Sequence, residues 1–128
     1  FLMQFLRGKL LGHVEVDVII GDLEGKKRIK VTALVDTGAT FTVIPENISK
    51  DLNLTYTGEK VKVSTAKGYD ELDLVHAILE IDKKRRIMPV LISKHIDRVL
   101  IGVITLEAMQ LRVNPLTGKL EEYTVLLY

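Results

Sequence analysis

Hydrophobic and polar residues alternate along much of this chain, with the period of two that is typical of β-strands. The alternation runs through residues 13–20 and resumes at 28–35, after a turn signal at 21–25 that contains two glycines. We expect these segments to form a β-hairpin. Similar alternation predicts three further strands, at residues 60–64, 72–81 and 86–92.

Other segments have different patterns. Residues 45–52 begin with Pro and Glu and carry apolar residues four apart, which predicts a short helix. Residues 102–109 predict a second helix, and residues 120–128 predict a last strand after a turn at 114–118. Many short strands separated by turns indicate an all-β protein whose sheet closes into a barrel or packs as a sandwich.

Length and charge limit the functional classes. A chain of 128 residues is large enough for one core, so we expect residues 1–128 to form a single domain. The formal charge of +1 provides no strong field to attract nucleic acid or an anionic membrane, and we expect neither partner. The apolar residues 1–6 are too few for a membrane span and lack the preceding basic region of a signal peptide.

The absence of cysteine removes disulfides, thiol catalysis and thiolate metal sites from consideration. It leaves the compartment open, with the cytoplasm favoured over secretion. The histidines His13, His76 and His95 are far apart and show no metal-ligand spacing. We therefore expect no metal site and no cofactor.

One carboxylate is distinguished by its neighbours. Asp36 directly follows the apolar residues 29–35 and begins the sequence Asp-Thr-Gly-Ala-Thr, after which apolar residues resume at 41–44. Asp-Thr-Gly is also an ordinary turn composition, because Asp bonds to nearby backbone and Gly adopts positive φ. The apolar segments on both sides indicate that Asp36 does not lie in a freely solvated loop.

Residues 33–44, Ala-Leu-Val-Asp-Thr-Gly-Ala-Thr-Phe-Thr-Val-Ile, resemble the active-site segment of the retroviral-type (retropepsin-like) aspartic proteases. A second block, Val-Leu-Ile-Gly and then Thr-Leu-Glu-Ala-Met within residues 99–109, resembles the apolar-apolar-glycine segment and C-terminal helix of that family. The resemblance covers most of the chain, from about residue 12 to 128. It implies a closed, barrel-like acid-protease fold with one short C-terminal helix and a flap hairpin over the site.

The resemblance also implies an activity, the hydrolysis of peptide bonds in peptides or unfolded proteins by an aspartic endopeptidase. That mechanism needs two aspartates, and this chain has one Asp-Thr-Gly, so a homodimer with the active site on its two-fold axis is implied. One Asp36 would activate water while the other, protonated, binds the peptide carbonyl. The apolar ends, residues 1–6 within a possible N-terminal extension at 1–11 and residues 123–128, are the strands expected at the interface.

Further roles follow from the same resemblance. Thr37 would bond across the dimer axis, Gly38 would let the substrate backbone approach closely, and Ala39 would leave the carboxylate without a neighbouring hydroxyl. Ile101 and Gly102 would support this loop. The tip of the flap is expected at 64–70, with substrate contacts from Ala66, Lys67, Gly68 and Tyr69.

Some alternatives stay open. The flap residues also fit an ordinary hairpin with a glycine turn. Viral members commonly have an acid at the position of Thr40 and an arginine at that of Val103, which form an ion pair that both residues here lack. The chain also fits a dimeric peptide-binding or assembly module without catalysis, or a module cut from a longer polyprotein.

Overall fold

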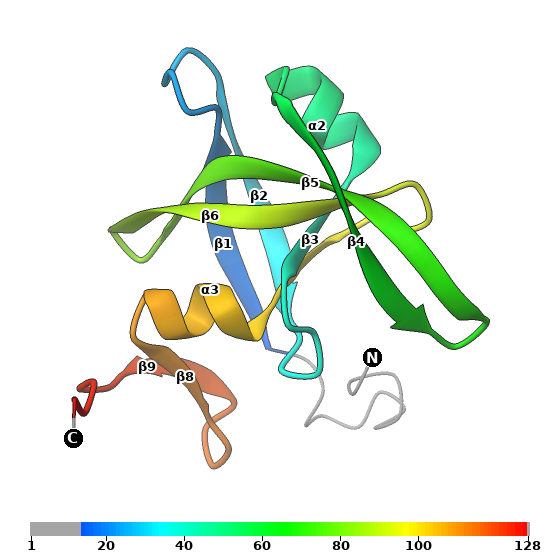
Figure 1. Ribbon diagram of the computed structural model, residues 1–128. Coiled ribbons are helices and arrows are strands. Elements are labelled where there is room, and N and C mark those ends of the chain that lie inside the picture. Colours follow the sequence, from blue (N-terminus) through cyan, green and yellow to red (C-terminus); the bar gives the residue numbers. More distant parts are fainter. Residues whose placement is uncertain (1–13, 128) are drawn as a thin grey trace.

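The structure is a computed structural model, and it describes residues 14–127. It contains nine strands and two short helices among these residues (Figure 1). Their bounds are β1 Glu15–Gly21, β2 Arg28–Val35, β3 Thr42–Pro45, α2 Glu46–Leu52, β4 Tyr56–Thr65, β5 Gly68–Ile81, β6 Lys84–Ser93, β7 Val99–Ile101, α3 Val103–Ala108, β8 Leu111–Asn114 and β9 Lys119–Glu122.

Six strands close into a barrel (Figure 1). Their order is β1-β2-β7-β3-β6-β5, and β5 pairs back onto β1 between Ile19↔Glu80 and Gly21↔Ile78. The β2–β7 and β3–β6 pairs are parallel, and the other barrel pairs are antiparallel. The closed barrel confirms the predicted all-β, retropepsin-like fold class.

Alternate residues of the strands fill the barrel interior, as the period of two requires. In β1, Val18 and Ile20 are fully buried while Asp17 is exposed. Burial of a large aliphatic side chain contributes roughly 1.5–3 kcal/mol, so this interior is the main source of stability. The largest fully buried side chains include Ile20, Ile44, Leu79, Ile81, Ile101 and Met109.

A long hairpin extends from the barrel (Figure 1). The strand β4 pairs with β5, and the 14-residue β5 continues beyond the residues that pair with β6. The hairpin turn is tighter than the sequence predicted, because Thr65 pairs with Gly68 and two residues remain between them. Gly68 has a φ of 121°, a value that favours glycine.

The predicted helices at 45–52 and 102–109 are observed as α2 and α3. The predicted strand at 120–128 is observed only at its start, because β9 ends at Glu122 and residues 123–127 have no regular secondary structure. Its partner β8 begins at Leu111. Tyr123, the residue after β9, donates its N–H to the carbonyl of Gln110, the residue before β8 (3.0 Å). The ladder therefore ends beside Gln110, between the end of α3 and the start of β8.

The proposed interface strand at 1–6 and the extension at 1–11 lie outside the described residues. Among residues 14–127, neither of the two helices has the length and hydropathy needed to cross a membrane.

Candidate functional site

Asp36 lies where β2 meets β7. The parallel ladder between these strands continues past their ends, because the N–H of Asp36 donates to the carbonyl oxygen of Ile101 (2.9 Å). We call residues 36–40 the Asp36 loop. Within this loop the N–H of Gly38 donates to Oδ1 of Asp36 (2.9 Å), and the N–H of Ala39 donates to its carbonyl oxygen (3.0 Å). The carboxylate is therefore fixed both by the barrel and by its own turn.

The N-terminus of α3 holds the other side of the Asp36 loop. The N–H of Val103 donates to the carbonyl oxygen of Ala39 (2.8 Å), and that of Ile104 donates to the carbonyl oxygen of Thr40 (3.0 Å). The first N–H groups of a helix have no partner within the helix, so the loop carbonyls satisfy them. These backbone bonds hold the Asp36 loop against α3 although Thr40 and Val103 carry no charges that could pair.

Gly102 lies directly beneath the Asp36 loop. A Cβ at this position would collide with the backbone carbonyl of Phe41 and would lie 2.9 Å from the carbonyl oxygen of Ala39. Its φ of −94° is ordinary, so the requirement for glycine is one of space and not of backbone conformation. The structure thus brings Ile101 and Gly102 against the loop that the sequence assigned them to support.

Two buried threonines complete the support, and no pattern in the sequence distinguishes them. The hydroxyls of Thr42 and Thr105 are 2.7 Å apart, and the N–H of Gly102 donates to Oγ1 of Thr42 (3.1 Å). Both threonines have 0% exposure. Buried polar groups that are hydrogen-bonded in this way fix the relative position of the elements that carry them. Here they join β3 to α3 and to the residue that follows β7.

The environment of Asp36 changes its acidity. The residue is 1% exposed. Burial raises the pKa of its carboxyl above the ordinary value of 3.8, because desolvation penalises the charged form, and the Gly38 amide lowers this pKa in part by bonding to the carboxylate. A carboxyl group whose pKa is raised keeps its proton to higher pH. It is suited to donate a hydrogen bond or a proton to a bound substrate.

An apolar surface lies between the Asp36 loop and the hairpin. Leu34 precedes Asp36 by two residues and pairs in register with Leu100 of β7. These leucines belong to a group, here called the outer cluster, that is separate from the barrel interior. The hairpin contributes four of its members, so one face of the hairpin packs on the side of the barrel that carries Leu34. The outer cluster consists of Val43, Leu91 and Leu100 with Leu34, Phe41, Val61, Val63, Leu72, Leu74 and Ile96.

The predicted flap residues Ala66, Lys67, Gly68 and Tyr69 form the exposed tip of the hairpin. The hydroxyl of Thr65 donates to the carbonyl of Gly68 (3.0 Å) and accepts from the N–H of Lys67 (3.2 Å). Within residues 14–127, no hydrogen bond or ion pair joins this tip to the Asp36 loop. Thr37 and Gly38, in contrast, are exposed on the loop itself.

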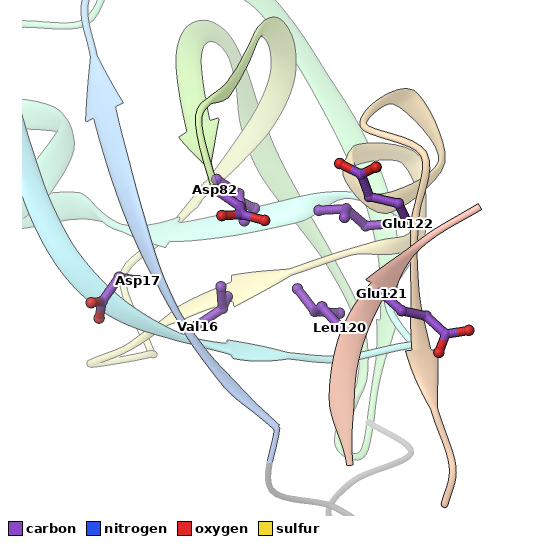
Figure 2. A pocket seen from close by; sticks show the side chains of 8 residues that line it. Val16, Asp17, Asp82, Leu120, Glu121 and Glu122 are labelled. Atoms are coloured by element: carbon purple, nitrogen blue, oxygen red, sulfur yellow. The ribbon is translucent and has the colours of Figure 1, made fainter. Parts of the chain in front are cut away.

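A well-defined pocket lies away from the Asp36 loop. A cavity of about 290 Å³ separates the barrel from the β8–β9 hairpin, with Val16 and Leu120 among its apolar walls (Figure 2). Asp17, Glu121 and Glu122 at its rim each pair with a lysine or arginine. No residue of the Asp36 loop lines it. In the described part of the chain, no three acidic or histidine side chains are grouped to hold a metal ion.

Comparison with known proteins agrees with this geometry. The chain matches the family described as "gag-polyprotein putative aspartyl protease" over residues 21–108, more than half of its length. No curated protein matches it. The matched region contains β2, the Asp36 loop, the long hairpin and α3. This chain therefore belongs to the gag-polyprotein aspartyl protease family.

Proposed function

We propose that the protein is a homodimeric aspartic endopeptidase in which the Asp36 residues of two subunits form one catalytic pair. The observation that carries this proposal is the buried carboxyl of Asp36, whose pKa is raised. It lies on a hydrogen-bonded loop in a chain that belongs to a family of aspartyl proteases. One chain supplies one such carboxyl. A second copy is the simplest source of the other, with the exposed Thr37 and Gly38 at the contact between the loops.

Two carboxyls close together cannot both ionise at low cost, so the pair retains one proton. The ionised member takes a proton from a water molecule, whose oxygen attacks the carbonyl carbon of the peptide bond. The protonated member hydrogen-bonds the carbonyl oxygen and stabilises the tetrahedral intermediate. Proton transfer to the amide nitrogen then allows the C–N bond to break. Burial of Asp36 supports this division of roles because it favours the protonated form.

In this proposal, the hairpin formed by β4 and β5 acts as the flap over the active site. Its inner face contributes Val61, Val63, Leu72 and Leu74 to the outer cluster, and an extended peptide would lie between that face and the Asp36 loop. Main-chain hydrogen bonds to the tip residues Ala66, Lys67, Gly68 and Tyr69 would hold the peptide as an added strand. Closure of the hairpin would exclude water other than the nucleophile.

The test compares wild type with Asp36→Asn in the cleavage of an unfolded protein between pH 3 and 7. Asn keeps the acceptor for the Gly38 amide but cannot ionise, so the loop is preserved while the chemistry is lost. We expect acid-favoured cleavage in wild type, block by an inhibitor with a hydroxyl at the scissile position, and a loss of at least about 10³-fold in the variant. Sedimentation equilibrium of both proteins measures the dimer.

Equal cleavage by the two proteins would overturn the proposed mechanism. A dimer that binds peptides but cuts none would instead favour the peptide-binding module. A rate that stays flat from pH 3 to 7 would contradict a pair that shares one proton.

A further inference from the structure

The inner face of the hairpin carries an acidic residue near the tip. Side chains two residues apart in a strand lie on the same face of a sheet. Leu72 and Leu74 of β5 pack in the outer cluster, and Asp70 precedes Leu72 by two residues. Asp70 also pairs directly with Val63, which packs in the same cluster. Asp70 therefore lies on the face that covers the barrel, at its open, tip-side end.

Two lysines of the hairpin, Lys60 and Lys62, lie on the opposite face, and a third, Lys67, lies in the turn. Lys60 pairs with Asp73 (3.2 Å), and the ammonium of Lys62 lies 4.5 Å from the centre of the Tyr69 ring. Both lysines alternate with the inward valines of β4, so neither can reach Asp70. Among the described residues, the carboxylate of Asp70 makes no ion pair, and its hydrogen bond comes from the N–H of Glu71 (2.8 Å).

We propose that Asp70 selects extended peptides that carry a lysine or arginine beside the apolar side chain covered by the outer cluster. This inference rests on the proposed function, because it places the peptide between the hairpin and the Asp36 loop. A guanidinium or ammonium there would form a charge-assisted hydrogen bond with the free oxygen of Asp70. A glutamate or aspartate would instead be repelled and left partly desolvated.

The proposed dimer has a consequence for this preference. Two hairpins would each bring one Asp70 to the same peptide, on opposite sides of the scissile bond. The preference for a basic side chain should therefore appear on both sides of the cut. This specificity comes from the hairpin and is separate from the chemistry at Asp36.

The test uses a peptide series with a fixed apolar pair at the scissile bond and Lys, Gln or Glu at the flanking positions. Affinity is measured by fluorescence anisotropy on the Asp36→Asn variant, and kcat/KM is measured with Asp36 intact. We expect Lys peptides to exceed Glu peptides by at least about fivefold in both, with a smaller ratio at 1 M salt.

Two matched variants locate the effect. Asp70→Asn removes the charge but keeps an acceptor for the Glu71 amide, and we expect it to abolish the Lys-over-Glu ratio. Glu71→Gln changes net charge equally, one residue away on the outer face, and we expect it to keep the ratio. A Lys-over-Glu ratio near one in the parent would overturn the inference. An equal fall in the ratio in both variants would also overturn it, since that result is a net-charge effect.

The outcomes separate this inference from the proposed function. Hydrolysis lost in Asp36→Asn but without a Lys preference would support the protease and overturn the role of Asp70. If the protein with Asp36 intact binds Lys peptides preferentially but hydrolyses none, the role of Asp70 would be supported and the protease overturned. Peptides that are neither bound nor cut would overturn both.

Discussion

The hydroxyls of Thr42 and Thr105 lie 2.7 Å apart although 63 residues separate them in the chain. The hydrogen bond that the Gly102 N–H donates to Thr42 extends this contact to the end of β7. Three segments that surround the Asp36 loop are thus joined by one pair of buried hydroxyls. These hydroxyls are buried, and a buried polar group that loses its hydrogen-bond partner destabilises the fold.

This threonine pair leads to an ordered prediction for stability. Thr42→Val leaves both the Gly102 N–H and the Thr105 hydroxyl without a partner, whereas Thr105→Val leaves the Gly102 bond in place. An unsatisfied buried polar group costs about 1–3 kcal/mol, so Thr42→Val should destabilise the fold more than Thr105→Val. Urea denaturation of both variants measures the difference. Equal losses would show that the Gly102 bond adds nothing.

Gly102→Ala should damage the site through steric overlap. The added methyl would collide with Phe41, whose backbone is held by the Asp36 loop and β3. We expect a loss of at least about 1–3 kcal/mol in stability, together with a loss of cleavage because the loop is displaced. In Gly21→Ala, the control, the nearest atom to the new methyl would be 3.3 Å away, at the Lys27 carbonyl. If Gly21→Ala loses as much stability as Gly102→Ala, the loss would not come from a clash specific to Gly102.

The raised pKa of Asp36 predicts how stability depends on pH. The folded chain binds this proton more tightly than the unfolded chain, whose carboxyl has the ordinary value of 3.8. The ionised form therefore destabilises the folded protein at neutral pH, and this penalty is absent below about pH 3.8, where both states are protonated. Asp36→Asn should be more stable than wild type at pH 7, with the difference vanishing in acid.

Urea denaturation at several pH values tests this dependence. Asp97→Asn, on an exposed residue, is the control and should show no such gain at neutral pH. A variant at Asp36 that is less stable than wild type at pH 7 would mean that the ionised carboxylate is favourable in the fold.

Lys84 links the barrel to the C-terminal hairpin. Its ammonium donates to the carbonyl oxygen of Met109 (2.8 Å), at the end of α3, and lies 3.3 Å from the carboxylate of Glu122. Lys84→Met keeps the apolar stem but removes both contacts. We expect faster amide hydrogen exchange in β8 and β9, with the barrel strands unchanged. Lys83→Met, one residue earlier and exposed, should leave exchange in that hairpin as it is.

The sequence predicted the elements whose burial alternates. The strands β1 and β2 have one buried and one exposed face, so the period of two is visible. β7 is three residues long and buried throughout, and no alternation identifies it as a strand. The start of β4, at Tyr56, was not predicted for the opposite reason. It is exposed with no buried face, and its pairing is irregular before Lys60.

The site was predictable to a similar extent. The position of Asp36 between apolar segments and the spacing to Gly102 were visible in the sequence and agreed with a known family. The threonine pair was not visible, because Thr42 is β-branched and fits an apolar strand as well as a hydrogen-bonded position, and Thr105 is a polar residue in a short helix. A single sequence contains no signal that joins Thr42 to a residue so distant. The strand expected at 120–128 was predicted too long, because propensity does not tell where a pairing partner ends.

The parallel pairing of β2 with β7 also affects when the site is assembled. Asp36 is synthesised before the residues that hold it, because the carbonyl that receives its N–H belongs to Ile101 and the amides that hold its loop belong to Val103 and Ile104. Contacts so distant in sequence form late, because a long loop must close first. A nascent chain therefore carries the aspartate without the geometry that would make it reactive. The backbone bonds that hold the Asp36 loop are therefore complete only after α3 has left the ribosome.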